Sequence, residues 1–184
     1  MRNIKNIILT GIGLGILTAT SIEADPGLVD TRSETIRDSR TGIEVLVDSS
    51  QLKRYQALAD STIDLTRRDG KYAIIVNKFA RELDLYYRGR LVHSFPIDLG
   101  RNPIPDKLFE GDGATPEGFY RVNWVRNGVE VPTRLYRALM LNYPTREDYS
   151  EFEHASRNGH IPAYVDNPGD AIEIHGYGGS GRDW

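Results

Sequence analysis

The 184-residue sequence contains no cysteine. Disulfide bonds, thiolate zinc sites and a cysteine nucleophile are therefore excluded within these residues. The chain also lacks a strong excess of charge, since 23 Lys and Arg against 26 Asp and Glu give a net charge of −3. Without a basic field, the composition does not favour binding to nucleic acid. Hydrophobic residues make up 39% and charged residues 27%, which suits one globular core with an extension.

Histidine is scarce too, with four residues scattered along the chain. His154 and His160 are six residues apart, with Gly159 between them, which is not the spacing of two ligands on one helical face. No phosphate loop, serine-nucleophile elbow or Ser-x-x-Lys motif is found. We therefore expect no metal and no cofactor.

A glycine pattern near the C-terminus resembles a dinucleotide motif. Gly176, Gly178 and Gly181 fit G-x-G-x-x-G after a strand. That motif requires a helix to open directly afterwards, inside a parallel-sheet unit, whereas only three residues follow Gly181 here. The match is interpreted as coincidence.

The N-terminus has the layout of a secretory signal. Arg2 and Lys5 precede an uncharged, mostly apolar run over residues 7–19, and small residues then offer cleavage sites. The run is short for a helix that spans a bilayer. An uncleaved anchor or a buried helix is the alternative, although three glycines within the run disfavour a helix. We expect residues 1–24 to be a signal peptide, with export to the periplasm or cell envelope and no stable membrane insertion after cleavage.

Residues 25–70 are expected to form a leader with one helix. Residues 25–50 are polar, apart from a possible short strand at residues 43–47. Apolar residues recur at near-helical spacing from Ser49 to Arg68, and Gly70 follows as a stop. No residue of this helix belongs to a chemical constellation, so we assign it a packing or spacer role.

Beyond residue 70 the pattern changes to strands. They are expected at residues 72–77, 82–87, 91–97, 119–125, 138–143 and 171–175. Tight turns between the first three favour antiparallel pairing. A short helix is expected from Thr145, a suitable N-cap, to about Asn158. The fold class is therefore predicted to be mainly β with short helices (α+β).

The last predicted strand delivers a histidine into a glycine-rich loop. Ile172 and Ile174 should share one face of this strand, and Glu173 and His175 the other. An imidazole suits general base chemistry because its pKa lies near working pH. The alternative is a hydrogen-bonded structural histidine.

These segments together resemble the L,D-transpeptidase family, also called the YkuD domain, over residues 71–184. The resemblance is carried by the strand-turn-strand unit at residues 72–100, by Ala114-Thr115-Pro116-Glu117-Gly118-Phe119-Tyr120 and by Ile172-Glu173-Ile174-His175-Gly176, in the family's order. The Thr-Pro-Glu-Gly turn is moderately specific alone and becomes a strong signal when a His-Gly strand follows. The resemblance implies an antiparallel β-sandwich, here expected to be C-terminally incomplete.

The resemblance also implies a reaction. Family members form 3→3 cross-links in peptidoglycan: a cysteine thiolate attacks a tetrapeptide stem before its terminal D-alanine, and the side-chain amine of a second stem takes the acyl group. His175 matches the family's base, and Gly176 matches the neighbouring small residue that lets substrate approach the backbone. The family's cysteine, in a Gly-Cys pair shortly after a tryptophan such as Trp184, has no counterpart in this sequence.

Gly178, Gly179 and Arg182 are weaker candidates for substrate binding, because turn residues or a solvated loop explain them equally well. The sequence is therefore compatible with two functions. One is an envelope L,D-transpeptidase of cell-wall biogenesis whose partners are peptidoglycan stem peptides. The other is a non-catalytic truncated homologue, or a pseudogene product, that at most binds cell-wall peptide.

Overall fold

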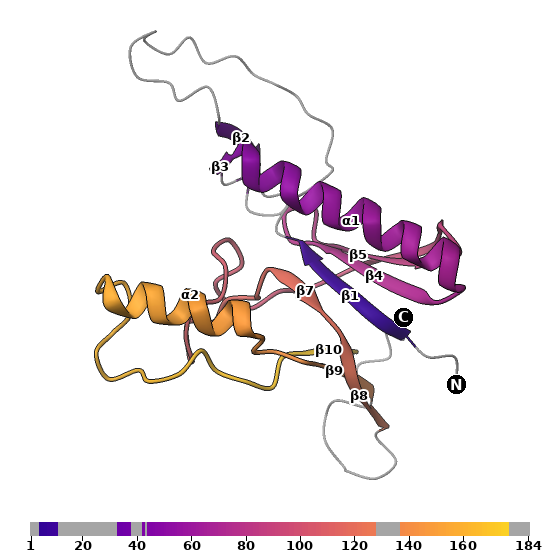
Figure 1. Ribbon diagram of the computed structural model, residues 1–184. Coiled ribbons are helices and arrows are strands. Elements are labelled where there is room, and N and C mark those ends of the chain that lie inside the picture. Colours follow the sequence, from indigo (N-terminus) through magenta and orange to yellow (C-terminus); the bar gives the residue numbers. More distant parts are fainter. Residues whose placement is uncertain (1–3, 11–32, 38–41, 43, 128–136, 177–184) are drawn as a thin grey trace, which may run out of the picture.

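The computed structural model describes residues 4–10, 33–37, 42, 44–127 and 137–176 (Figure 1). Two helices lie in this part of the chain, α1 (Ser49–Asp69) and α2 (Arg146–Arg157). Its strands are β1 (Ile4–Thr10), β2 (Ser33–Arg37), β3 (Glu44–Asp48), β4 (Tyr72–Asn77), β5 (Glu82–Tyr87), β6 (Arg90–Pro96), β7 (Gly118–Tyr120), β8 (Val122–Asn127), β9 (Arg137–Leu141) and β10 (Glu173–His175). The strand-rich α+β class predicted from sequence is thereby confirmed.

The larger sheet has the strand order β6-β5-β4-β1-β7. β4, β5 and β6 form the predicted antiparallel meander, and Gly89 supplies the positive φ of +73° that the turn between β5 and β6 requires. β1, however, pairs parallel with β4 and antiparallel with β7. The larger sheet is therefore not antiparallel throughout, because one of its strands comes from the N-terminal segment.

The smaller sheet has the order β10-β9-β8 and is antiparallel throughout. Only Arg121 separates β7 from β8, so one extended run of chain leaves the first sheet and enters the second. A shared hydrophobic cluster contains Ile74, Val76 and Leu83 from the larger sheet and Leu141 from the smaller one. Side chains from both sheets thus share one core, while a regular two-layer sandwich stays a prediction.

Helix α1 contacts β1, β4 and β5 of the larger sheet (Figure 1). Its bounds agree with the prediction from apolar spacing, and Gly70 ends it with a φ of +61° while its N–H donates to Thr66 O at 3.0 Å. The buried Thr66 hydroxyl also accepts a 2.8 Å hydrogen bond from Gly89 N. The helix is therefore attached to the turn between β5 and β6 as well as packed on the sheet.

Two strands were not predicted from sequence. Residues 4–10 form β1 at the edge of the apolar run interpreted as a secretory signal, and its isoleucines have the β-branched shape that favours an extended backbone. β2 is mostly polar and pairs with β3, which itself was expected one residue earlier. Removal of residues 1–24 on export stays a prediction. Among the described residues, neither helix combines the length and apolar character needed to cross a membrane.

Candidate active site

His175 is the last residue of β10 and lies opposite Ala138 of β9. Its side chain is exposed, as is the adjoining Gly176, whose N–H donates to Arg137 O at 3.4 Å. A Cβ added to Gly176 would meet no described heavy atom within 4 Å. The end of β10 therefore offers an accessible imidazole beside space that no described residue fills, a geometry that a base acting on an external substrate needs.

The alternation predicted for this strand is present. Ile172 and Ile174 pack against the hydrophobic cluster, and Leu141 N donates to Ile172 O at 3.0 Å. Glu173 and His175 occupy the opposite face by the period-two geometry of a strand. Burial of the isoleucines fixes the strand, and the strand in turn fixes the position of His175.

A second group of polar residues lies on the same face of the small sheet. Arg126 of β8 faces Ala138, and its Nη2 lies 3.1 Å from Glu173 Oε1. The guanidinium also lies over the Trp124 ring, 5.7 Å from its centroid. Trp124 is not a core residue, because 53% of its surface is exposed. Sequence analysis missed Arg126, and no local signal in β8 marks it.

The Thr-Pro-Glu-Gly turn is built around a buried lysine. Lys78 Nζ donates to Glu117 Oε1 at 2.9 Å and to the carbonyl oxygens of Pro105 and Thr115 at 2.9 and 2.8 Å. Gly118, the last residue of this turn, has a positive φ of 148°. The family-like turn thus serves to anchor the loop before β7.

Asp106 lies beside this anchor. Its Oδ1 accepts hydrogen bonds from Glu117 N and Lys107 N, both at 2.7 Å. Burial and the neighbouring Glu117 carboxylate raise the pKa of Asp106 to about 7, although the hydrogen bond from Glu117 N opposes the shift. This carboxyl group therefore titrates near neutral pH.

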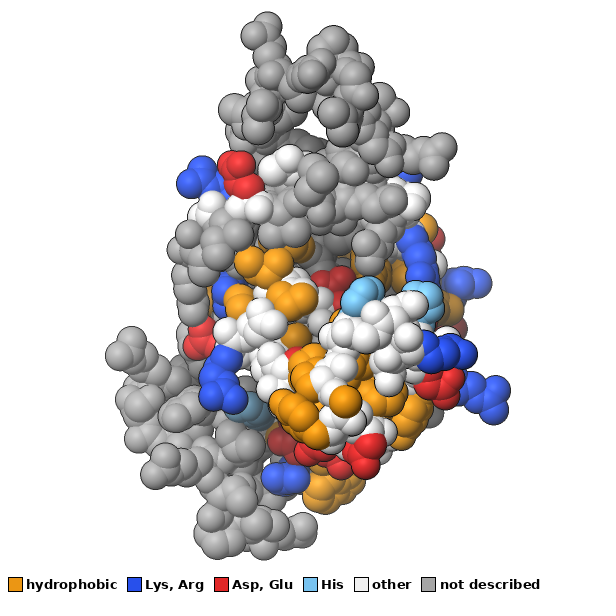
Figure 2. Space-filling model, turned by 90° about the vertical axis from the view of Figure 1, so that its left-hand side faces the viewer, with side chains coloured by type: hydrophobic (Ala, Val, Ile, Leu, Met, Phe, Trp, Pro, Cys, Tyr) orange, Lys and Arg blue, Asp and Glu red, His pale blue; other side chains and the backbone are white. Residues whose placement is uncertain are grey.

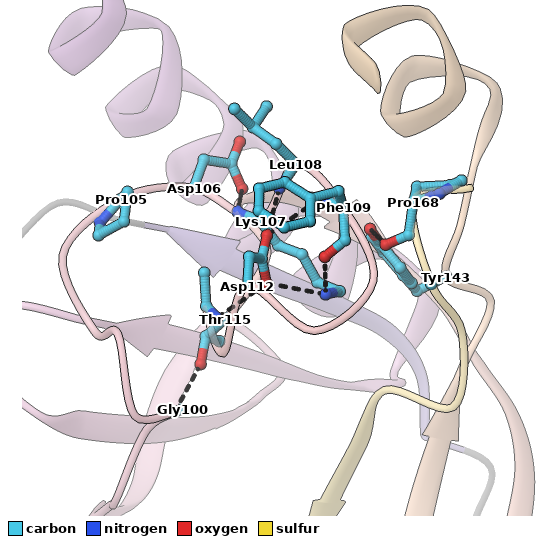
Figure 3. A network of polar contacts seen from close by, with 12 residues as sticks. Gly100, Pro105, Asp106, Lys107, Leu108, Phe109, Asp112, Thr115, Tyr143 and Pro168 are labelled. Atoms are coloured by element: carbon cyan, nitrogen blue, oxygen red, sulfur yellow. Dashed lines mark hydrogen bonds and ion pairs between the residues drawn. The ribbon is translucent and has the colours of Figure 1, made fainter. Parts of the chain in front are cut away.

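The loop between β6 and β7 is closed by a second buried ion pair (Figure 3). Lys107 Nζ lies 2.9 Å from Asp112 Oδ1 and donates to Phe109 O at 2.9 Å. Burial opposes ionisation of Asp112, yet hydrogen bonds from Phe109 N, Ala114 N and Lys107 lower its pKa. The close-up also shows Gly100 N bonded to Thr115 Oγ1, at 3.0 Å, so both ends of the loop are fixed.

His154 and His160, which the sequence analysis did not pair as metal ligands, lie elsewhere. A shallow groove of about 430 Å³ is lined by Leu108 and, from α2 and the residues after it, Ser150, Glu151, His154, Ala155 and His160. Figure 2 looks onto the end of the molecule that carries α2, where histidine side chains are visible at the surface. His154 Nε2 lies 3.0 Å from Asn158 Nδ2. In the part of the chain that is described, no group of three His, Asp or Glu side chains is placed to hold a metal ion.

Gly178, Gly179 and Arg182 lie outside the described residues. His93 is exposed on β6, where its ring lies 4.3 Å from that of Phe95. The structure therefore brings the polar residues His175, Glu173 and Arg126 to one end of the small sheet, next to Gly176.

Fold and site together define a strand-rich α+β domain that presents an accessible histidine from the end of a core-anchored strand. The family model of the L,D-transpeptidase catalytic domain, YkuD, matches residues 71–184. The chain belongs to this family, whose members are acyltransferases that act on peptidoglycan peptides. Comparisons with curated proteins and with solved structures gave no match.

Proposed function

We propose that the protein is an L,D-transpeptidase of the cell envelope that forms 3→3 cross-links between peptidoglycan stem peptides. The observation that carries the proposal is the exposed His175 at the end of β10, inside a segment that the family model covers. In this role His175 is the general base, and Gly176 is the small residue beside which the substrate backbone lies. Gly178, Gly179 and Arg182 are proposed as further contacts to substrate.

The first half-reaction is an acyl transfer to sulfur. The imidazole of His175 takes the proton of a cysteine thiol, and the thiolate attacks the carbonyl carbon that precedes the terminal D-alanine of a tetrapeptide stem. The C–N bond then breaks, the imidazolium returns its proton to the leaving amine, and a thioester remains on the enzyme. The thiol must come from residues beyond the 184 of this sequence, which contain no cysteine.

The second half-reaction releases the acyl group. The side-chain amine of a second stem attacks the thioester carbonyl and gives up a proton to His175. The C–S bond breaks, the sulfur is reprotonated and the cross-linked peptide leaves. One imidazole therefore serves both halves, which requires that it be held in place while it stays open to substrate. The pairing of β10 with β9 and the burial of Ile174 provide that fixed position.

The alternative is a non-catalytic homologue or pseudogene product that at most binds cell-wall peptide. Both functions are compatible with the absence of cysteine from the 184 residues. Reading the gene past the codon for Trp184 separates the two functions. An in-frame Gly-Cys pair within the next several codons supports the transpeptidase, whereas a stop codon there leaves only the non-catalytic function.

Export is proposed on the basis of the N-terminal segment. The charged start, the apolar run and the small residues that follow support removal of residues 1–24 by signal peptidase. N-terminal sequencing of the protein from the envelope fraction tests this. A mature chain that begins near residue 25 would support export, and an intact Met1 in the cytoplasmic fraction would contradict it.

A further inference from the structure

One face of the small sheet places one arginine in the same row as the candidate base. His175, Ala138 and Arg126 are directly opposite one another on β10, β9 and β8. Opposed residues in an antiparallel sheet project to the same face. Ala138, the small residue of the row, is only 1% exposed, and it leaves room for a longer side chain to pass over the middle strand.

The side chain of Arg126 crosses β9 above Ala138 and reaches β10. Its Nη2 lies 3.1 Å from Glu173 Oε1, although Glu173 is on the strand beyond β9. The Glu173 side chain is 9% exposed and the Arg126 side chain 26%. The carboxylate is thus the buried partner that orients the guanidinium, and the guanidinium is the partner that solvent or a ligand reaches.

The ion pair does not use the whole guanidinium. Arginine presents five N–H donors in a planar fork, and the contact with Glu173 involves Nη2. One face of the group lies over Trp124, which is itself 53% exposed. An accessible, oriented cation beside an exposed aromatic ring is a site for a carboxylate attached to an apolar group.

We propose that Arg126 binds the terminal carboxylate of the stem peptide and so determines specificity for a peptide with a free C-terminus. This inference rests on the proposed function. Glu173 is a positioning residue, since it acts by holding Arg126 across Ala138. Trp124 contacts the side chain of the terminal residue.

The distances within the sheet suit this assignment. Neighbouring strands are about 4.8 Å apart, so the backbones at His175 and Arg126 are separated by roughly 10 Å. The arginine side chain closes part of that gap as it extends towards β10. The terminal carboxylate lies one residue beyond the attacked carbonyl, within about 3.5 Å of chain per residue. A base at His175 and a cation at Arg126 can therefore engage the two groups of one terminal residue.

The test is a binding titration followed by the fluorescence of Trp124. The chain has two tryptophans, so the full chain with Trp184→Phe leaves Trp124 as the reporter. The probes are a synthetic tetrapeptide stem that ends in D-alanine and the same peptide with its terminal carboxylate amidated. Arg126→Gln, Arg126→Lys and Glu173→Gln are compared in this background. Arg137→Gln is the matched control, because Arg137 is exposed and adjoins Ala138 on β9, hence faces the other way.

We expect the unaltered chain to bind the acid about 10- to 100-fold more tightly than the amide, as for a charge-assisted hydrogen bond. Arg126→Gln should abolish this preference, Glu173→Gln should reduce it, and Arg137→Gln should leave it intact. Arg126→Lys should keep part of it, and this variant tests the proposal even if Arg126→Gln fails to fold, as judged by circular dichroism.

The outcomes separate this inference from the proposed function. Equal preference for the acid in the unaltered, Arg126→Gln and Arg126→Lys proteins would overturn the assignment of Arg126 and leave the proposed function standing. Equal binding of acid and amide by the unaltered chain would also overturn the assignment of Arg126. Failure of the unaltered chain to bind either peptide would count against the proposed function itself.

Discussion

Lys78 Nζ lies 2.9 Å from Glu117 Oε1, and the lysine side chain is only 1% exposed. Lys78 directly follows β4, whereas Glu117 directly precedes β7. The ion pair therefore joins two strands of the larger sheet that β1 separates. Carbonyl oxygens of Pro105 and Thr115 complete the shell around the ammonium group, so its three N–H donors are all used.

Lys78→Met should destabilise the fold by about 3–5 kcal/mol, because it leaves a buried carboxylate and two carbonyl groups without their donor. Urea denaturation followed by circular dichroism measures the change. Lys71→Met is the control: its partner Asp69 is at 3.3 Å and both side chains are nearly half exposed, so we expect a cost of about 1 kcal/mol or less. Equal effects of the two substitutions would contradict the structural importance of the Lys78 pair.

Asp106 should make stability depend on pH in the acidic range. Its pKa rises from 3.8 in the unfolded chain to about 7 in the fold, so the folded state holds this proton more tightly. The stabilisation is therefore complete below about pH 4 and is lost as pH rises to 7, by up to about 4 kcal/mol.

Asp106→Asn keeps an oxygen that can accept the N–H of Glu117 and removes the titration. The difference in unfolding free energy between the variant and the unaltered protein, measured from pH 4 to 8, should shift in favour of the variant as pH rises. A difference that stays constant over this range would refute the assignment of the raised pKa to Asp106.

Tyr120→Phe should weaken the junction between β7 and α2. The Tyr120 hydroxyl donates to Asp148 Oδ1 at 2.6 Å, and the same carboxylate accepts hydrogen bonds from Thr145 in the capping box of α2. Loss of a buried hydroxyl partner costs about 1–3 kcal/mol. Thermal melting measures this, and Tyr164→Phe, at a side chain that is 88% exposed, should leave the melting temperature unchanged.

Two glycines should respond in opposite ways to alanine. A Cβ at Gly100 would lie 2.1 Å from Gly113 O, a backbone atom that cannot move freely, so Gly100→Ala should destabilise the loop. The added Cβ of Gly176→Ala meets no described atom within 4 Å, so this change should leave stability within about 0.5 kcal/mol. If Gly176 lies against substrate, the same change should weaken binding of the tetrapeptide stem. Loss of stability in Gly176→Ala would show that this glycine is structural.

His175→Ala should separate chemistry from folding. The side chain is exposed, so we expect a stability change below about 0.5 kcal/mol. In the product of the whole gene, should it encode the Gly-Cys pair, removal of the base should slow acyl-enzyme formation by about 10²–10⁴-fold. Covalent labelling by a carbapenem, followed by mass spectrometry, measures this. Undiminished labelling would rule out His175 as the base.

Local sequence patterns were sufficient to predict most helices and strands between residues 49 and 175. β4 and β5 match their predicted bounds, and α2 begins after the predicted cap, Thr145. These elements have strong periodicity or explicit start and stop residues. β2 has neither, because its residues are mostly polar, and β1 lies in a run that was interpreted as a secretory signal. Their strand state depends on partners that are distant in the chain.

The residues of the candidate site likewise fall into those that the sequence predicted and those that it did not. His175 and Gly176 form a contiguous motif, so sequence analysis identified both as candidate site residues. Arg126 and Glu173 belong to different strands, and they meet only because β9 pairs with both β8 and β10 in a particular register. A shift of one residue between β8 and β9 would send Arg126 to the opposite face, and the same shift between β9 and β10 would send Glu173 there.

Residue order alone therefore established the family-like motifs, the candidate base and the alternation that buries Ile174 beside an exposed His175. Three-dimensional pairing was needed to bring Arg126 against Glu173, to bury Lys78 against Glu117 and to raise the pKa of Asp106. The physical reason is that periodicity and turn residues act over a few neighbours. Burial, ion pairing and desolvation depend instead on which distant segments the sheets bring into contact.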